Sequence, residues 1–334
     1  MPPLAPILAV LLLPWVGTGC DAARGLRAAW RDALPREDPA VARARAEARL
    51  AGARRLLVQL QHLSFGDVEA ADPDVIVVDY SWDGGGDREM SRADVWRLRE
   101  RPGRPPRVVL AYLSTGEAES YRWYWEREAR GGRARFVIGE NPKWPGNFRV
   151  RYWDPAWRSV LAGGRGSYLA RILDAGFDGV FLDTVDTAEV LEEGGDAQAA
   201  GRMAALVTDL ARAARGVDPA FLVVAQNPFR ILAEPGVTDA LSGVVAEAHL
   251  HDGDEPVPDE RARPILDALR AMRDLGRRVL VIEYVRGRAA IDRLSALCAA
   301  ERFLCYVGSP SLSRVGVMLD PGPGPAGAGV GSFR

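Results

Sequence analysis

Eight short apolar segments alternate along the chain with amphipathic segments, and this order predicts an α/β fold, specifically a single (β/α)8 TIM barrel. The apolar segments are five to seven residues long and rich in Val, Ile and Leu. Continuous apolar runs of this length are typical of parallel strands that are buried on both faces. The expected strands, in chain order, span residues 56–62, 75–81, 108–113, 179–184, 222–227, 243–249, 279–285 and 304–308.

Helices are expected between these strands, at residues 91–100, 166–175, 197–215, 260–275 and 289–300. Ser91 followed by Asp94 has the spacing of a helix-start signature, and Gly176 and Gly276 suit positions where helices end. An open, doubly wound sheet is the main alternative, but it would need a Gly-rich phosphate loop after an early strand. The glycines at 84–86 lack the G-x-G-x-x-G order, so we interpret them as a flexible loop.

The first twenty residues have the features of an export signal. Residues 4–16 are apolar and uncharged, but the run is shorter than the roughly 20 residues of a membrane-spanning helix. Small residues follow it, and the sequence Gly-Thr-Gly-Cys, which resembles a bacterial lipoprotein box, ends at Cys20. We therefore expect a signal peptide at 1–20, lipidation of Cys20, and an exported protein that is either a membrane-anchored lipoprotein or secreted. A plain secretory signal without lipidation is the alternative.

The rest of the chain divides into three parts. Residues 21–55 are dominated by Ala, Arg, Glu and Asp and have weak apolar periodicity, so a tether or a surface helix is expected there. The barrel is expected at 56–315, followed by a Gly/Pro-rich tail at 316–334. Without the leader and the tether about 280 residues remain, which suits one barrel rather than two domains.

The composition limits the classes of partner. There are 43 Lys and Arg residues against 45 Asp and Glu residues, so the net charge is −2, and a dedicated nucleic-acid binder would carry a basic excess. The three His show no Cys/His spacing typical of zinc, and no cofactor or metal is expected. We expect a monomer whose only membrane contact is the lipid anchor. If Cys20 is lipidated, Cys298 and Cys305 are left, and two buried free thiols are favoured over a disulfide, which depends on their Cβ geometry.

Polar residues interrupt six of the apolar segments at their carboxyl ends, which is where the active sites of TIM barrels lie. Asp183 and Glu247 each follow apolar residues of the fourth and sixth expected strands, so both side chains are expected in the barrel mouth. The other candidate substrate-binding residues at this rim are Asp79, Tyr80, Tyr112, Glu117, Asp186, Asn227 and Glu283.

Two carboxyl groups across a pocket suit glycoside hydrolysis, because one protonates the leaving oxygen and the other acts as nucleophile or base. The same acids are also suited to binding a hard cation, but no His is predicted beside Asp183, which disfavours this use. Aromatic residues crowd the segments 121–125 and 144–157. Some are expected in the core, and the others suit flat surfaces on which sugar rings stack.

Several segments together resemble glycoside hydrolase family 114, a TIM-barrel family that includes endo-α-1,4-polygalactosaminidases. They are VVDYSWDG, VLAYLSTGEAESYRWYW, YWDPAW, AGFDGVFLDTVDT, AQN and VVAEAH, and the resemblance as a whole runs from about residue 57 to residue 308. The resemblance implies that Asp183 is the nucleophile or electrostatic stabiliser and Glu247 the general acid/base, with Asp79, Tyr80, Glu117 and Asn227 binding the sugar. The AEAHLHDGDEP segment, which begins at Ala246 and contains Glu247, departs from the family pattern, so the loop that shapes the substrate subsites is expected to differ.

The expected function is therefore that of an exported, endo-acting glycoside hydrolase that needs no cofactor. Its expected substrate is an extracellular or envelope polysaccharide or oligosaccharide, with an α-1,4-linked, galactosamine-containing polymer as one candidate. A non-catalytic carbohydrate-binding barrel of the same family is the alternative from another class, and a hydrolase for a different bond is the third.

Overall fold

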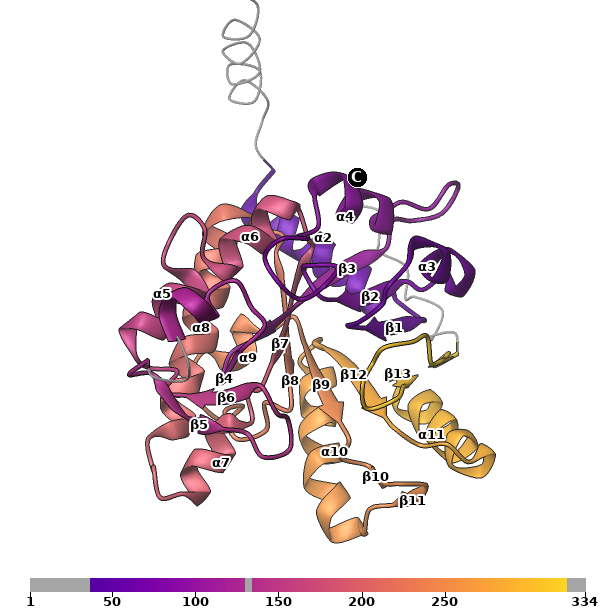
Figure 1. Cartoon of the computed structure of the whole chain (residues 1–334). Helices are drawn as coiled ribbons and strands as arrows, with labels where there is room; N and C mark the ends of the chain where they lie inside the picture. Colours follow the sequence, from indigo (N-terminus) through magenta and orange to yellow (C-terminus); the bar gives the residue numbers. More distant parts are fainter. Residues whose placement is uncertain (1–36, 130–133, 323–334) are drawn as a thin grey trace, which may run out of the picture. The chain divides into compact units, whose positions relative to one another are not determined.

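The computed structural model describes residues 37–129 and 134–322 of the chain (Figure 1). The expected signal peptide, including Cys20, lies outside the described residues. The described part from Pro39 onward forms one compact unit. No helix in this part of the chain is long and apolar enough to span a membrane.

Eight parallel strands form the central sheet, and each expected strand is present. They are β1 (Leu56–Gln59), β2 (Val75–Val78), β3 (Val108–Ser114), β7 (Gly179–Asp183), β8 (Leu222–Gln226), β9 (Gly243–Glu247), β12 (Arg278–Glu283) and β13 (Leu304–Val307). Neighbours in this sequence are neighbours in the sheet, and every pair among them is parallel. The backbone amide of Leu60 donates to the carbonyl of Leu312 at 2.8 Å, which links the two ends of the nearly closed barrel. The predicted TIM-barrel fold is confirmed.

A ninth strand, β14 (Val317–Leu319), extends the sheet by antiparallel pairing with β13. It lies in the segment expected as a Gly/Pro-rich tail. The sequence Val-Met-Leu is the apolar part of that segment, and Leu319 is buried against the barrel.

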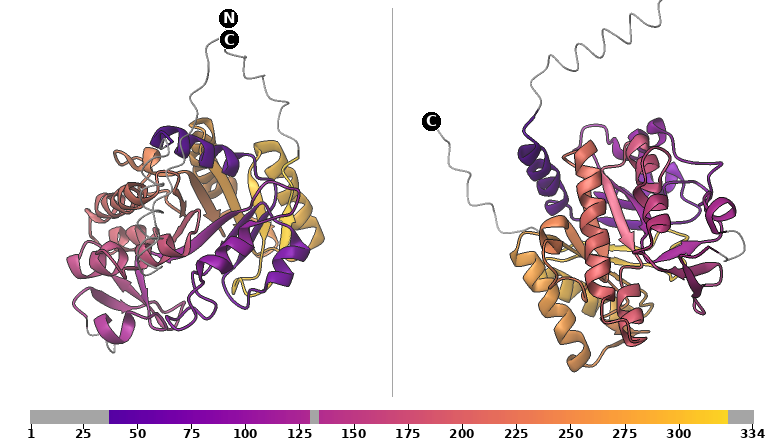
Figure 2. Two further views of the ribbon diagram at one scale, coloured as in Figure 1. Left: turned by 90° about the horizontal axis from the view of Figure 1, so that it is seen from above. Right: turned by 90° about the vertical axis from the view of Figure 1, so that its left-hand side faces the viewer.

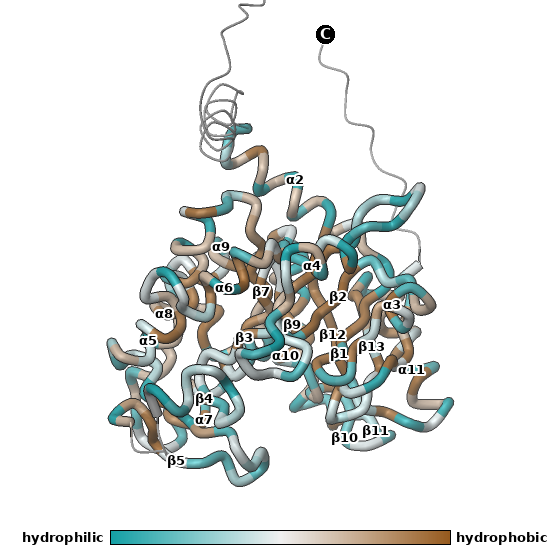
Figure 3. Tube along the Cα trace, turned by 45° about the horizontal axis from the view of Figure 1, so that its top comes forward, coloured by the Kyte–Doolittle hydropathy of each residue, from teal (hydrophilic) through white to brown (hydrophobic). Residues whose placement is uncertain are grey.

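Helices surround the strands of the barrel and help to bury most of their residues (Figure 2). They are α2 (Pro39–Ala51), α3 (Phe65–Ala71), α4 (Arg92–Arg99), α5 (Pro155–Ala162), α6 (Tyr168–Ala175), α7 (Thr187–Glu193), α8 (Ala199–Val217), α9 (Val237–Ala240), α10 (Asp259–Asp274) and α11 (Arg288–Glu301), with a π-helical turn, η1, at Trp125–Ala129. Apolar positions gather on the strands in the middle of the unit (Figure 3). Ser91 and Asp94 form the expected capping box of α4, and Gly176 ends α6 in a left-handed conformation.

Helix α2 lies in the segment expected as a tether or surface helix, and it packs against the barrel. Leu50 is fully buried, and Arg49 forms an ion pair with Asp178, which precedes β7. The other oxygen of Asp178 accepts from the Arg99 side chain at 3.2 Å and from the backbone of Val109 at 2.9 Å. These contacts join α2, α4 and the sheet at the end of the barrel where the strands begin.

Two insertions extend the opposite end, where the strands finish. After β3 the chain forms a small antiparallel sheet of β4 (Glu117–Glu119), β5 (Val137–Glu140) and β6 (Asn147–Val150), with β6 in the middle. After β9 it forms a hairpin of β10 (His251–Asp252) and β11 (Glu255–Pro256). Both insertions therefore follow strands that carry candidate site residues.

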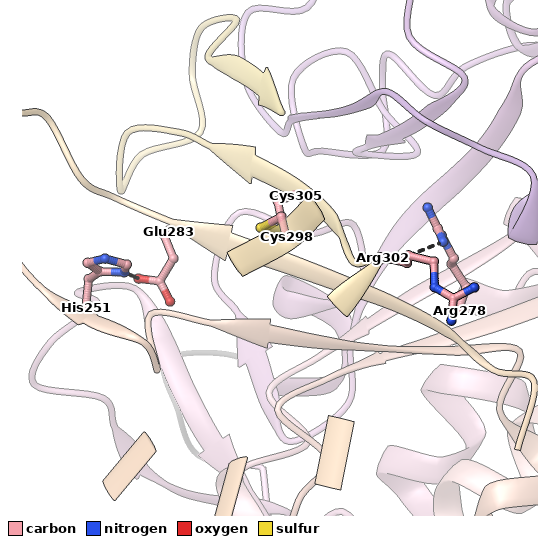
Figure 4. Close-up of a disulfide and its surroundings, with 6 residues drawn as sticks. All are labelled: His251, Arg278, Glu283, Cys298, Arg302 and Cys305. Atoms are coloured by element: carbon pink, nitrogen blue, oxygen red, sulfur yellow. Dashed lines mark hydrogen bonds and ion pairs between the residues drawn. A yellow bond between two sulfur atoms is a disulfide. The ribbon is translucent and has the colours of Figure 1, made fainter. Parts of the chain in front are cut away.

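The prediction of two free thiols is wrong, because Cys298 and Cys305 form a disulfide (Figure 4). Cys298 lies in the last turns of α11, and a left-handed residue, Arg302, then reverses the chain into β13. This turn brings the two Cα atoms to 6.2 Å, within the range that a disulfide spans. Both cysteines are fully buried, as expected.

Candidate active site

A cavity of about 570 Å³ opens at the carboxyl ends of the strands. Five of the predicted site residues line it, and they are Asp79, Tyr112, Glu117, Asp183 and Glu247. Four lie outside its lining, and they are Tyr80, Asp186, Asn227 and Glu283.

The alternation of side chains along the strands explains part of this division. Asp183 and Phe181 are two residues apart on β7, and Phe181 lies directly beside Tyr112 of the neighbouring strand β3. Because side chains two residues apart face the same side of a sheet, all three point into the barrel mouth. Glu247 is the partner of Ile282, so Glu283, one residue further, faces the other side.

The same rule separates Asp79 from Tyr80. Asp79 points into the cavity, whereas Tyr80 packs outside the sheet against Tyr168 of α6, with ring centroids 4.9 Å apart. Gln226 at the end of β8 points inward and lines the cavity, while Asn227 has the opposite parity. Adjacent residues at the end of one strand therefore point in opposite directions, one into the cavity and the next away from it.

A tyrosine hydrogen bond and the nearby carboxyl group of Glu247 both affect the ionisation of Asp183. The Tyr112 hydroxyl donates to Asp183 Oδ2 at 2.7 Å. Burial raises the pKa of Asp183 well above its usual range, and the charge of Glu247 raises it further, while the Tyr112 hydrogen bond opposes both. The two carboxyl groups are therefore close enough to influence each other's ionisation.

Glu247 accepts hydrogen bonds on both carboxyl oxygens. The Tyr284 hydroxyl donates to Oε1, and Gln226 Nε2 donates to Oε2 at 3.3 Å. Burial raises the pKa of Glu247, and these two donors oppose the rise because they favour the ionised form. Neither donor was among the predicted site residues, although both follow directly from the parity of β8 and β12.

The residues after β7, β8 and β9 share an unusual backbone conformation. Thr184, Asn227 and Ala248 have φ values of 58°, 45° and 55°, in the left-handed region that non-glycine residues rarely adopt. The Thr184 hydroxyl accepts from the Gly116 amide at 2.8 Å, and Asn227 Oδ1 accepts from the Glu247 amide at 2.9 Å. Side chains at the strand ends thus fix the strained backbone beside both acids.

Arg122, which was not among the predicted site residues, forms a buried ionic cluster at the edge of the cavity. Its Nη2 lies 2.7 Å from Asp79 Oδ2, and its Nε donates to Glu119 Oε2 at 2.7 Å. Its Nη1 also donates to the Gly84 carbonyl at 2.9 Å. The guanidinium is therefore occupied by protein oxygens, and its role is to hold two carboxylates at the cavity wall.

The charge of the cavity is mainly negative. Among the described residues that line it, six carry carboxyl groups, and they are Asp79, Asp83, Glu117, Glu119, Asp183 and Glu247. Arg122 is the one guanidinium in that lining. A concentration of carboxylates in a recess favours a cationic ligand.

Glu117 and Asp186 are two further predicted site residues with buried carboxyl groups, the first on β4 of the small sheet and the second just before α7. Glu117 accepts from Asn141 Nδ2 at 2.7 Å, and Arg149 Nε lies 3.9 Å away. Asp186 precedes α7 and accepts from Asn227 Nδ2 at 3.5 Å. Burial raises the pKa of both carboxyl groups.

The aromatic segments contribute both to the core and to the cavity. Trp157 and Tyr152 are fully buried, as is typical of core residues. Trp82, Tyr121 and Trp144 line the cavity, and about half of the surface of Trp144 and of Tyr121 is exposed. These three side chains provide the flat apolar surfaces at the rim. In the described residues no group of three or more acidic, His or Cys side chains is arranged to hold a metal ion.

Relatives of the chain are found in bacteria and archaea. It is 33% identical over 210 residues to an uncharacterized protein of Deinococcus radiodurans, covering 63% of this chain and 66% of that protein. It is 32% identical over 233 residues to an uncharacterized protein of Methanocaldococcus jannaschii, covering 68% of this chain and 65% of that one. The chain thus spans slightly less than two thirds of the length of these two relatives.

Two solved structures have a similar fold. The glycoside hydrolase domain of PelA from Pseudomonas aeruginosa has a TM-score of 0.61 and 22% identity, covering 80% of this chain and 98% of that one. Aspergillus fumigatus Ega3, determined in complex with galactosamine, has a TM-score of 0.60 and 18% identity, covering 78% of this chain and 94% of that one. The sequence model of glycoside hydrolase family GH114 matches residues 43–321. The chain therefore belongs to glycoside hydrolase family GH114.

Proposed function

We propose that the protein is a glycosidase that cuts an amino-sugar polysaccharide with Asp183 and Glu247 as its two catalytic carboxyl groups. The observation that carries this proposal is their position in one cavity, on strands β7 and β9, with mutual electrostatic influence. Membership of family GH114 supports this class of reaction, because most glycosidases use a pair of carboxyl groups on either side of the scissile bond.

The proposed mechanism divides one proton between the two acids. Repulsion between two close carboxylates favours a state in which the pair keeps a single proton. When the polymer is bound, Glu247 gives this proton to the oxygen of the leaving sugar, and the C–O bond breaks. The Asp183 carboxylate faces the positive charge that develops at the anomeric carbon, as nucleophile or stabiliser. Water then supplies the hydroxyl group of the product and returns a proton to Glu247.

The hydrogen bonds around Asp183 and Glu247 are also consistent with a second candidate mechanism, in which the two acids exchange roles. Tyr284 and Gln226 both stabilise ionised Glu247, whereas Asp183 has one side-chain donor, Tyr112. In the free protein these donors favour the proton on Asp183. A reaction with Asp183 as the acid and Glu247 as the nucleophile or base is therefore the second candidate.

The proposed substrate is a partly deacetylated, α-1,4-linked galactosamine polymer. The excess of carboxyl groups in the cavity supports this choice, because free amino groups on the sugar are cationic at neutral pH. Galactosamine is the sugar bound in the Ega3 structure. Trp82, Tyr121 and Trp144 at the rim are proposed to stack on sugar units, which suits an enzyme that cuts within a chain.

The test compares Asp183→Asn and Glu247→Gln with the parent on this polymer. We expect each variant to lose about 10²–10⁴-fold in kcat, the usual contribution of a positioned acid or base. Glu193→Gln, on the exposed side of α7, is the matched control and is expected to keep full activity. If the parent binds the polymer but releases no product, the protein is a carbohydrate-binding barrel; if both variants match an active parent, the named roles are wrong.

Azide separates the two assignments. With the nucleophile missing, azide attacks the substrate directly, so Asp183→Asn is expected to form a glycosyl azide of inverted anomeric configuration. With the acid/base missing, azide attacks the covalent glycosyl–enzyme instead, so any azide formed by Glu247→Gln is expected to keep the configuration of the substrate. The reverse pattern would establish Asp183 as the acid. The anomeric configuration of the first product, followed by NMR, then decides between retention and inversion.

We also propose that the protein is exported and anchored through Cys20. The leader sequence supports this proposal, and so does the buried disulfide, since disulfides persist mainly in oxidising compartments. Labelling of cells with a fatty-acid analogue is expected to mark the parent and not Cys20→Ser. Label on both proteins, or on neither, would refute the anchor.

A further inference from the structure

A second cavity of about 470 Å³ lies beside the first at the same end of the barrel. Its lining comes from the hairpin after β9, from the end of β12 and from the segment after β13, and its members are Ala248, His251, Asp252, Gly253, Asp254, Glu283, Tyr284, Arg286 and Pro310. Its size is within the range of small-molecule sites.

Two observations connect this cavity with the proposed catalytic centre. Tyr284 lines it and also donates its hydroxyl hydrogen to Glu247. Pro310 lines both cavities. The second cavity therefore borders the tyrosine that contacts Glu247 and shares one lining residue with the first cavity.

The second cavity contains an incomplete hydrogen-bond pair, His251 and Glu283 (Figure 4). His251 Nδ1 lies 3.9 Å from Glu283 Oε2, too far for a hydrogen bond. The His251 side chain is 6% exposed, and its Nδ1 has no hydrogen-bond partner among the described residues. A buried polar atom without a partner is unusual and indicates a site for another polar group.

The other oxygen of Glu283 is already used. Glu283 Oε1 accepts from the backbone amides of Leu250 at 2.8 Å and His249 at 3.2 Å, which fixes the root of the hairpin. At the tip, Asp254 Oδ1 accepts from the amides of Arg286 and Gly287 at 2.6 and 2.9 Å. Both walls of the gap between His251 and Glu283 are therefore held by the protein without a ligand.

The chemistry of the gap suits a sugar hydroxyl. A hydroxyl group donates one hydrogen bond and accepts two, so one placed to the side of the pair, within hydrogen-bond distance of both residues, gives Nδ1 the partner that it lacks and also contacts Oε2. A phosphate or sulfate would meet the carboxyl groups of Asp252, Asp254 and Glu283, with Arg286 as the one cation in the described lining. Building on the function proposed above, we propose that the second cavity binds a further sugar unit of the polymer, with a hydroxyl group within hydrogen-bond distance of both His251 and Glu283.

The experiment measures kcat/KM on partly deacetylated α-1,4-galactosamine oligosaccharides of increasing length. We expect His251→Ala to lose about tenfold on oligosaccharides long enough to reach the cavity, and to match the parent on the shortest one that is cut. The position of cleavage in the long oligosaccharides is expected to shift as well. His251→Asn, which offers an amide oxygen or nitrogen near the place of Nδ1, is expected to recover part of the loss.

His249→Ala is the matched control, because His249 lies two residues before His251 but its ring packs against Phe229 and it does not line the second cavity. An equal loss at every length, or a loss shared by the control, would mean that His251 only supports the hairpin and would overturn the proposal. No change at any length would overturn it too. If the parent cuts none of these sugars, the catalytic proposal fails, and calorimetric titration of the longest oligosaccharide into parent and His251→Ala then tests the subsite by itself; equal affinity overturns it.

Discussion

Replacement of Glu283 by glutamine is expected to make the protein less sensitive to rising pH. Burial raises the pKa of the Glu283 carboxyl from 4.5 to about 7, and the charge of Glu247 adds to the rise, while the amides of Leu250 and His249 oppose it. In the folded state Glu283 therefore keeps its proton to a higher pH than in the unfolded chain. A glutamine side chain at this position would resemble the protonated form, since its amide also accepts at one end and donates at the other.

The magnitude follows from the two pKa values. Between pH 4.5 and 7 the folded state binds more protons than the unfolded state, so the free energy of unfolding falls as the pH rises. The full loss is about 2.5 units at 1.36 kcal/mol each, or about 3.4 kcal/mol, and about 2.5 kcal/mol of it falls between pH 5 and 8. The Glu283→Gln variant lacks this contribution. Its free energy of unfolding, relative to the parent, is expected to rise by about 2.5 kcal/mol over the same range.

Urea unfolding at pH 5, 6, 7 and 8, followed by circular dichroism, measures this difference. Other buried acids with raised pKa values, among them Asp183 and Glu247, change the stability of both proteins in the same direction, so only the difference between parent and variant is informative. Glu255→Gln, at the exposed end of the same hairpin, is the control and is expected to follow the parent. A constant difference between parent and Glu283→Gln at all four pH values would refute the reasoning.

Three further changes test other parts of the structure. Arg122→Met is expected to cost about 3–5 kcal/mol in urea unfolding, because it leaves two buried carboxylates without their partner; unchanged stability would contradict the cluster. Tyr112→Phe removes the hydrogen-bond donor to Asp183, so the pKa of Asp183 is expected to rise and the acidic limb of the pH profile of kcat/KM is expected to move to higher pH. If the limb stays at the same pH, the ionisation of Asp183 does not determine it. Replacement of Cys298 and Cys305 together by alanine is expected to cost about 2.5 kcal/mol, the loop-closure value for so short a loop, measured by urea unfolding against the parent with and without reductant.

The sequence was sufficient to predict the barrel and the end of it that holds the cavity. Each strand is a continuous apolar run, and in a barrel of parallel strands the polar residues that finish these runs meet at one end. Side-chain parity was the missing step at this rim. Asp79 faces the cavity and Tyr80 does not, and the pairing of Glu247 with Ile282 turns Glu283 away, yet parity is defined only when the register of neighbouring strands is known.

Arg122 shows where sequence reasoning ends. It lies in a segment of aromatic residues, and nothing in its local spacing relates it to Asp79, 43 positions earlier. The contact exists because the chain after β3 turns back over the barrel mouth as β4, which places the long Arg122 side chain between Asp79 and Glu119. An uncompensated pair of buried carboxylates would be costly, so the polar wall of this cavity depends on a residue that no strand-end pattern contains. Local patterns can therefore locate an active site on a barrel, whereas the groups that allow its acids to be buried depend on tertiary structure.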